Sequence, residues 1–152
     1  MEVKFSYPTS SQIAELAEAI RPEDWEECKD AGFSTPLEAV QLSVEESTEC
    51  WCATWSGDVL AIFGVRSTDT LCGSGVMWLL TSTLVESKKK TFTKYARRAL
   101  RAMLSRWRSL RLGIGNGHPK ALRFAYRSGF TPGHTYMDPR TGKPFTHHVI
   151  GD

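Results

Sequence analysis

Residues 76–107 read VMWLLTSTLVESKKKTFTKYARRALRAMLSRW, and they contain the clearest change of pattern in the chain. The first six, Val76 to Thr81, are apolar on both faces, which is typical of a central strand covered on each side. From Phe92 to Trp107 the apolar residues recur every three or four positions, which predicts an amphipathic helix. The opposite face of this helix is basic, with Lys94, Arg97, Arg98 and Arg101. The stretch therefore predicts a buried strand that leads into a helix with one basic face.

The join between this strand and helix contains the run KKKTFT, residues 88–93. A helix N-terminus presents free backbone N–H groups and the positive end of the helix dipole, which together suit an anion. Lys88, Lys89 and Lys90 at that end repel the dipole and one another, so the arrangement favours a bound anion. A solvated basic loop that needs no ligand is the alternative interpretation.

The flanking sequence predicts further strands and helices. Strands are expected at Val3–Tyr7, Glu49–Trp55, Val59–Val65, Arg111–Ile114, Thr135–Met137 and His147–Ile150. Helices are expected after a cap at Ser10 or Ser11, from Pro22 to Gly32, after the capping box Thr35–Glu38, and from Pro119 to Ser128 with a stop at Gly129. The order β-α-α-α-β-β-β-α-β-α-β predicts an α+β fold, a mixed sheet flanked by helices, in one domain over residues 1–152.

Length and composition suit one compact domain, and charge is distributed unevenly within it. The 152 residues are 41% hydrophobic and 24% charged, which excludes a disulfide-stapled miniature and a disordered tail. The net charge of +2 hides two opposed halves: residues 1–76 contain 4 Lys/Arg and 14 Asp/Glu, and residues 77–152 contain 15 and 3. Either the basic half has an anionic partner, or the two halves neutralise each other after folding.

No pattern in the chain predicts a metal site, a membrane span or a secretory signal. The four cysteines lack CxxC spacing and lie in the first half, whereas the four histidines lie in the second. The longest apolar runs are far shorter than the ~20 residues that a spanning helix needs. We therefore expect a soluble protein with reduced thiols, without a bound metal and without membrane contact, in a cytoplasm.

The element order, the run 88–93 and the stretch NGHPKALRFAYRSGF at 116–130 together resemble the GCN5-related N-acetyltransferase family. The resemblance implies that the loop before the long helix holds the pyrophosphate of acetyl-CoA. Pantetheine would lie where the strands 76–81 and 111–114 splay apart. The expected acetyl-CoA contacts are Leu80, Thr81, Lys88, Lys89, Lys90, Thr91, Phe92, Thr93 and Asn116.

Two departures from the family pattern concern the residues that carry its chemistry. Thr91 and Thr93 stand where the family's phosphate loop has glycine, and Ala125 stands where many members have a general-acid tyrosine. Tyr126 is the neighbouring tyrosine, about 100° further round the helix, so it should point elsewhere. A loop and helix of this kind also resemble the acetyltransferase-like internal virion proteins of short-tailed bacteriophages, which would imply a phage protein in the host cytoplasm or the virion.

Three functions are compatible with these patterns. The first is an N-acetyltransferase, for which Glu86 is the candidate base and Tyr126 the second candidate catalytic residue; a solvated Glu86 that offsets the lysines is the alternative. The second is a catalytically silent protein of the same fold that binds a virion protein or inhibits a host protein. The third is nucleic-acid binding through the basic helix face, although no recognised nucleic-acid motif accompanies it.

Overall fold

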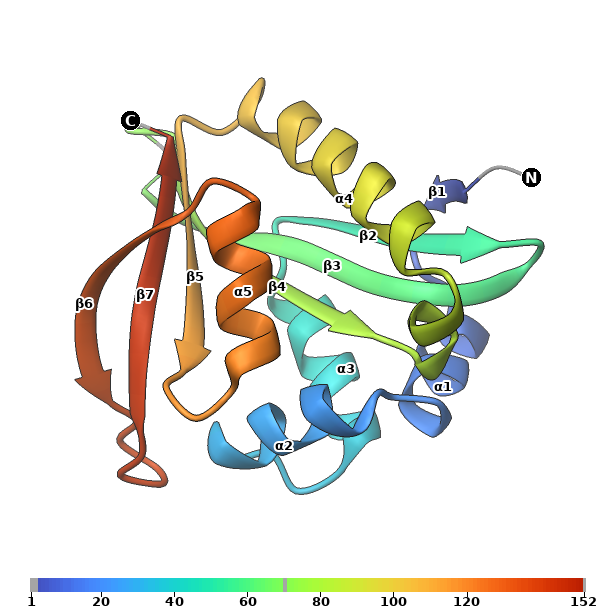
Figure 1. Cartoon of the computed structure of the whole chain (residues 1–152), viewed down its shortest axis with the longest axis horizontal. Helices are drawn as coiled ribbons and strands as arrows, with labels where there is room; N and C mark the ends of the chain where they lie inside the picture. Colours follow the sequence, from blue (N-terminus) through green and yellow to red (C-terminus); the bar gives the residue numbers. More distant parts are fainter. Residues whose placement is uncertain (1–2, 70, 152) are drawn as a thin grey trace.

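The computed structural model describes residues 3–69 and 71–151 of the chain (Figure 1). The elements follow in the order β1 (Val3–Ser6), α1 (Ser10–Glu18), α2 (Pro22–Asp30), α3 (Pro36–Glu46), β2 (Glu49–Trp55), β3 (Asp58–Asp69), β4 (Ser74–Thr81), the short 3-10 helix η1 (Thr83–Ser87), α4 (Lys89–Leu104), β5 (Ser109–Gly115), α5 (Pro119–Arg127), β6 (Thr131–Met137) and β7 (Pro144–Gly151). The predicted α+β class and the sequence of helices and strands are confirmed. The structure adds η1 and shows both of the expected C-terminal strands, which the predicted order writes as one.

The seven strands form one mixed sheet in the order β1-β2-β3-β4-β5-β7-β6. All neighbours are antiparallel except β4 and β5, which run parallel. A parallel pair needs a crossover connection. Here η1 and α4 make that crossover, and α4 returns the chain across the sheet (Figure 1).

Helices cover both faces of the sheet, and each face has its own apolar core. On one face, Met77 and Leu79 of β4 belong to the core beneath α4 and α5. On the other face, Trp78 and Leu80 belong to the core formed with α1, α2 and α3. Successive side chains of a strand point to opposite faces, so β4 is apolar on both. This confirms the prediction of a central strand covered on each side.

Two helix starts differ from their predictions. Thr9, rather than Ser10 or Ser11, caps α1, because its hydroxyl accepts the Gln12 N–H at 3.1 Å while the Gln12 side chain accepts the Thr9 N–H at 3.0 Å. This reciprocal pair is a complete capping box. Helix α4 begins at Lys89, so the lysine run lies in the first helical turn and not in a preceding loop.

Ion pairs join the acidic first half of the chain to the basic second half. Glu23 contacts Lys120 at 2.7 Å, and Asp30 contacts Lys143 at 2.6 Å and His118 at 2.8 Å. All of these carboxylates lie on α2, and all of their partners lie after residue 117. At the α2 interface, the structure therefore shows the second of the two alternatives, in which the acidic and basic halves neutralise each other.

Glu49 links the two halves at a second place, where β2 meets the end of α4. Its carboxylate accepts hydrogen bonds from Trp51 at 2.8 Å, from Trp107 at 3.0 Å and from the Arg106 guanidinium. Burial alone raises a carboxyl pKa, but these bonds outweigh it and lower the pKa of Glu49 to about 2. Glu49 therefore stays ionised in the folded protein.

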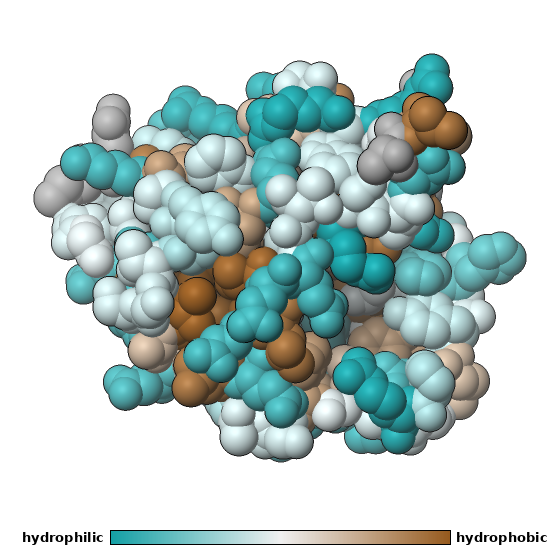
Figure 2. Space-filling view, turned by 180° about the vertical axis from the view of Figure 1, so that it is seen from behind, coloured by the Kyte–Doolittle hydropathy of each residue, from teal (hydrophilic) through white to brown (hydrophobic). Residues whose placement is uncertain are grey.

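The surface seen from behind is mostly hydrophilic, with an apolar patch that polar side chains cross and border (Figure 2). Within residues 3–69 and 71–151, no helix has the length and apolar character needed to cross a membrane.

Candidate functional site

The parallel strands β4 and β5 separate along half of their length. They pair over four positions, from Ser74 opposite Ser109 to Met77 opposite Leu112. Beyond this point β4 continues to Thr81 and β5 continues to Gly115, but the two strands are not paired. The facing edges therefore carry backbone N–H and C=O groups that are available to a ligand.

A cleft with a volume of about 590 Å³ opens where the strands separate. This volume lies within the ~300–1,000 Å³ that is usual for ligand sites. Leu79 and Thr81 of β4 and Leu112 and Ile114 of β5 form its floor. The walls come from α4 (Lys89, Phe92, Thr93, Arg97), from α5 (Lys120, Ala121, Arg123, Phe124, Arg127, with the following Ser128) and from α2 and its N-cap (Arg21, Asp24, Glu27).

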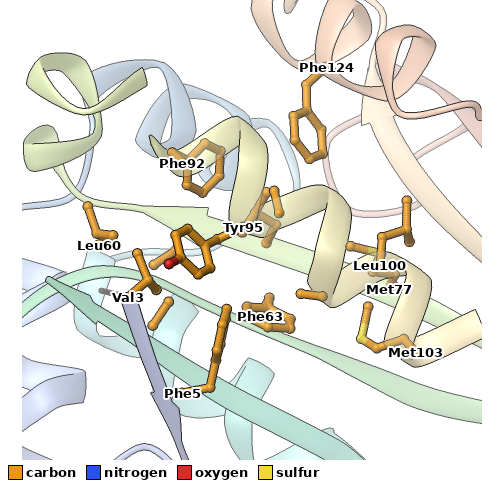
Figure 3. A pocket seen from close by; sticks show the side chains of 15 residues that line it. Val3, Phe5, Leu60, Phe63, Met77, Phe92, Tyr95, Leu100, Met103 and Phe124 are labelled. Carbon is orange, nitrogen blue, oxygen red and sulfur yellow. The ribbon is translucent and has the colours of Figure 1, made fainter. Parts of the chain in front are cut away.

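A second cavity lies beneath α4, next to this cleft (Figure 3). Its labelled side chains come from β1, β3, β4, α4 and α5, and the Tyr95 hydroxyl is the oxygen visible among them. Its volume of about 30 Å³ holds no more than a water molecule or two, and its lining is apolar. The larger cleft is therefore the candidate functional site.

Much of the lining that α4 and α5 contribute to the cleft is cationic. The N-cap of α4, Lys88, makes no side-chain capping bond, and the first turn contains no acidic residue. The first N–H groups of the helix thus lack partners within it, and they lie at the positive end of its dipole. Arg97, Arg123 and Arg127 line the same cleft and make no ion pair within the part of the chain that the structure describes. These groups are suited to a ligand with several negative charges.

Acidic side chains of α2 also line the cleft, near the start of α4: Arg21 contacts Asp24 at 3.2 Å and Glu86 at 3.6 Å, and Glu86 contacts Lys89 at 3.4 Å. Asp24 accepts both the N–H of Thr81, at 2.7 Å, and the Thr81 hydroxyl. Glu27, one helical turn later, accepts the N–H of Gly115 at 3.2 Å. The two carboxylates therefore bind the ends of the two separated strands, β4 and β5.

Glu27 has the ionisation behaviour of a general base. Burial raises the pKa of its carboxyl to about 7, although the charge of His118 and the hydrogen bond from Gly115 act in the opposite direction. A carboxyl with such a pKa can accept a proton from a reacting group and release it again at neutral pH. Glu27 is therefore the strongest candidate for acid–base chemistry in the cleft.

The segment between α1 and α2 fixes α2 at this position. The N–H of Arg21 donates to the carbonyl of Thr81 at 2.9 Å, and the N–H of Thr83 donates to the carbonyl of Ala19 at 2.8 Å. Arg21 also contacts Asp24 at 3.2 Å. The start of α2 is thus hydrogen-bonded to the end of β4, which holds Asp24 and Glu27 over the strand ends.

The structure divides the nine residues expected to contact acetyl-CoA into two groups. Thr81, Lys89, Phe92 and Thr93 line the cleft. Leu80 lies in the core on the other face of the sheet, and Lys88 lies over the Trp55 ring at 4.9 Å. The remaining three, Lys90, Thr91 and Asn116, are not part of the lining, and Asn116 accepts a hydrogen bond from Thr146 at 2.7 Å.

The two expected catalytic residues lie outside the lining of the cleft. Glu86 pairs with Lys89 at 3.4 Å and with Arg21 at 3.6 Å. Tyr126 is 80% exposed, whereas the preceding Ala125 is fully buried. Sequence reasoning missed Asp24 and Glu27 as site residues. Their spacing of three, which places them on one helix face, is the signal that could have found them.

Comparison with solved structures identifies the fold. The chain matches a spermidine N-acetyltransferase from Vibrio cholerae in complex with CoA and spermine, with a TM-score of 0.73 at 10% identity over 98% of this chain and 95% of that one. It also matches AAC(6')-Ib in complex with ribostamycin and coenzyme A, with a TM-score of 0.74 at 16% identity over 99% and 94%. The chain has the GCN5-related N-acetyltransferase fold.

No protein-family model matches the chain, and a search of curated proteins by sequence finds no match. Within the acetyltransferase fold, the cleft between β4 and β5 is the feature whose geometry and charge bear on function. No group of three or more potential metal ligands occurs in the described ranges 3–69 and 71–151.

Proposed function

We propose that the protein is an N-acetyltransferase that binds acetyl-CoA in the cleft between β4 and β5 and transfers the acetyl group to an amine. The observation that supports this most strongly is the charged lining of the cleft, which combines Lys89 and three arginines with the Glu27 carboxyl. The fold comparisons support it further, since one of the matched acetyltransferases is in complex with CoA and spermine.

The residues present fit acetyl-CoA. Its phosphate groups would be held by the free N–H groups of the first turn of α4, by Lys89, and by the unpaired arginines Arg97, Arg123 and Arg127. Its amide-containing arm would hydrogen-bond to the open strand edges. Thr93 lines the cleft at a position where the family pattern has glycine. Its side chain occupies space near the expected phosphate site, so fewer backbone amides can approach the phosphates.

Glu27 would act on the acceptor. It would take the proton that the amine loses as its nitrogen attacks the thioester carbonyl. The free backbone N–H groups of the strand edges would stabilise the negative charge that develops on the carbonyl oxygen. Most of the rate enhancement would come from holding the two substrates together.

The acceptor that fits best is a cationic amine. Asp24 and Glu27 put negative charge into the lining of the cleft. The two matched acetyltransferases are in complex with spermine and with ribostamycin, which both carry several amines. These two compounds are therefore the first acceptors to test.

The test combines calorimetry and a transfer assay. Acetyl-CoA should bind the wild-type protein, and Arg97→Ala should weaken the affinity about tenfold or more through loss of a charged contact. Arg101→Ala is the matched control, because Arg101 lies on the same helix but outside the lining of the cleft. No heat of binding at millimolar acetyl-CoA would contradict the proposal.

The second candidate function is a catalytically silent protein of this fold, acting in phage virion assembly or as an inhibitor of a host protein. The observation that favours it is Ala125, which is buried and leaves α5 without a tyrosine hydroxyl directed at the cleft. Binding of acetyl-CoA without transfer to any amine would support this candidate over the first. The phage origin itself stays a prediction from sequence.

A further inference from the structure

The apolar cavity beneath α4 and the cleft share part of their walls. Leu79 of β4, Phe92 of α4 and Phe124 of α5 line both spaces. The Phe92 and Phe124 rings lie on one side of the cavity, with their centres 6.2 Å apart (Figure 3). Leu79 lies two residues beyond Met77, the last residue of β4 that pairs with β5. The cavity and the cleft therefore adjoin where the two strands separate.

The surface of this cavity is almost wholly apolar. Among the described residues that line it, only Tyr95 has a polar side-chain atom. Leu60 and Met103, which lie in the same wall, are almost fully buried in the core beneath α4. A buried water molecule needs two to four polar partners, so a space of this kind stays dry and suits an apolar group.

The volume of the cavity limits what can enter it. Its 30 Å³ or so is two to three times the ~10–15 Å³ that one water-sized group requires. A methylene group is close to a water molecule in size. The cavity therefore has room for about two methylene groups.

We propose that the cleft also binds CoA thioesters of straight acyl chains with three or four carbons, and that the tail of the chain lies in the cavity beneath α4. This inference rests on the proposed function, because it requires the thioester to lie where β4 and β5 separate. Propionyl and butyryl groups have one and two methylenes more than acetyl, and beside Leu79 these would enter the cavity.

Transfer of the longer group forms and breaks the same bonds as transfer of acetyl. The acceptor nitrogen bonds to the carbonyl carbon, and the carbon–sulfur bond breaks with its electron pair on sulfur. The proton that the amine loses ends on the CoA thiol. No further co-reactant is needed, so the chain length alone distinguishes the donors.

The far wall of the cavity sets an upper limit to the chain length. Phe5 of β1 lies across the cavity from Phe124 (Figure 3), and its ring centre is 6.4 Å from that of Tyr95. A chain of six carbons would have to displace these rings, which is unfavourable in a packed interior. We therefore expect the affinity to be highest for butyryl-CoA and to fall for hexanoyl-CoA.

Calorimetry of the full chain with acetyl-, propionyl-, butyryl- and hexanoyl-CoA tests this order. Each methylene that leaves water should increase the affinity about fourfold, so butyryl-CoA should bind about 15-fold more tightly than acetyl-CoA. Hexanoyl-CoA should bind more weakly than butyryl-CoA. This measurement needs no acceptor and does not depend on the rate of transfer.

Ala96→Leu tests where the tail lies. Ala96 lines the cavity but not the cleft, so a leucine at this position would fill the space and leave the lining of the cleft intact. Acetyl-CoA should bind within about twofold of wild type, and the gain for butyryl-CoA should disappear. Ala102→Leu is the matched control and should keep the wild-type order, because Ala102 is an exposed residue of α4 that lines neither space.

Met77→Ala makes the opposite change. Met77 lines the cavity but not the cleft, and its replacement by alanine enlarges the cavity by three heavy atoms. The chain that binds most tightly should then lengthen from butyryl to hexanoyl. Circular dichroism first shows whether this variant folds, because Met77 is buried. If it does not fold, Ala96→Leu alone decides.

The outcomes separate this inference from the proposed function. If wild type bound acetyl-CoA as tightly as butyryl-CoA, or more tightly, the role of the cavity would be overturned and the proposed function would stand. The same would follow if Ala96→Leu kept the preference for butyryl-CoA, or if a folded Met77→Ala kept the wild-type order. Failure of every CoA thioester to bind would overturn both.

Discussion

The N–H of Gly115 donates to the carboxylate of Glu27 at 3.2 Å, although 88 positions separate these residues in the chain. The bond connects α2 to the last residue of β5, beside the cleft. Its acceptor is a carboxyl group whose pKa burial raises to about 7.

The first prediction concerns the pH dependence of acetyl transfer. Because Glu27 must be ionised to accept a proton, kcat should rise as the pH increases from 6 to 8 and level off above the pKa of about 7. Glu27→Gln should lower kcat by about 10²- to 10⁴-fold and remove this dependence. A stopped assay across that pH range measures both effects. A Glu27→Gln variant with the wild-type profile would remove Glu27 from the mechanism.

The second prediction concerns stability and the same carboxyl. Its pKa is raised from 4.5 in the unfolded chain to about 7, so the stabilisation it provides is complete below pH 4.5 and is lost as the pH rises through 7. Glu27→Gln should therefore be more stable than wild type at pH 8, by roughly 3 kcal/mol at 1.36 kcal/mol per pKa unit, and similar to it at pH 4.5.

Urea unfolding at the two pH values measures this difference. Glu26→Gln is the control, because Glu26 is a neighbouring carboxylate with 60% of its side chain exposed. If Glu27→Gln changed the free energy of unfolding equally at pH 4.5 and pH 8, this would contradict the raised pKa of Glu27.

The third prediction concerns Asp24, which binds the end of β4. Thr81 is buried, and Asp24→Ala would leave both its N–H and its hydroxyl without this acceptor. Two unsatisfied buried groups should lower the free energy of unfolding by about 2–4 kcal/mol. Asp24→Asn retains an acceptor oxygen and should cost less. Denaturant unfolding measures the free energy of unfolding of both variants. If Asp24→Ala and Asp24→Asn lowered it equally, the hydrogen bonds to Thr81 would not be the cause.

The fourth prediction concerns acid stability and Glu49. The pKa of this carboxyl is lowered from 4.5 to about 2 because the bonds from Arg106, Trp51 and Trp107 outweigh the effect of burial. The ionised Glu49 carboxylate therefore stabilises the fold above pH 4.5, and this stabilisation is lost as the pH falls towards 2.

Glu49→Gln should therefore lower the free energy of unfolding at pH 7 by about 1–3 kcal/mol, a range that allows for solvent screening at the half-exposed Arg106. At pH 2 the same substitution should change the free energy of unfolding little. Tryptophan fluorescence during acid titration reports this directly, since Trp51 and Trp107 both contact Glu49. If Glu49→Gln destabilised the protein more at pH 2 than at pH 7, the lowered pKa of Glu49 would be refuted.

Much of the fold can be predicted from local sequence. The predicted bounds of β2 agree with the structure to the residue, and Gly129, with a φ of +97°, follows the end of α5 as expected of a glycine stop. The predicted end of β3 is too early, because residues 66–69 are polar and continue the strand beyond the core. Their backbone pairing with β4 holds them in the strand, and side-chain periodicity does not report such pairing.

The site is less predictable, because its chemistry comes from residues distant in sequence. Local charge indicates the lysine run, and Lys89 does line the cleft. Asp24 and Thr81 are 57 positions apart, and no local pattern indicates that they meet.

The spacing of Asp24 and Glu27 also explains how the cleft stays open. Unpaired edges of adjacent parallel strands would otherwise pair with each other, since each presents the groups that the other needs. The two carboxylates occupy the N–H groups of Thr81 and Gly115, which lie at the open ends of β4 and β5. One turn of α2 thus acts as a spacer of fixed length, and the width of the gap is set by helix geometry rather than by a ligand.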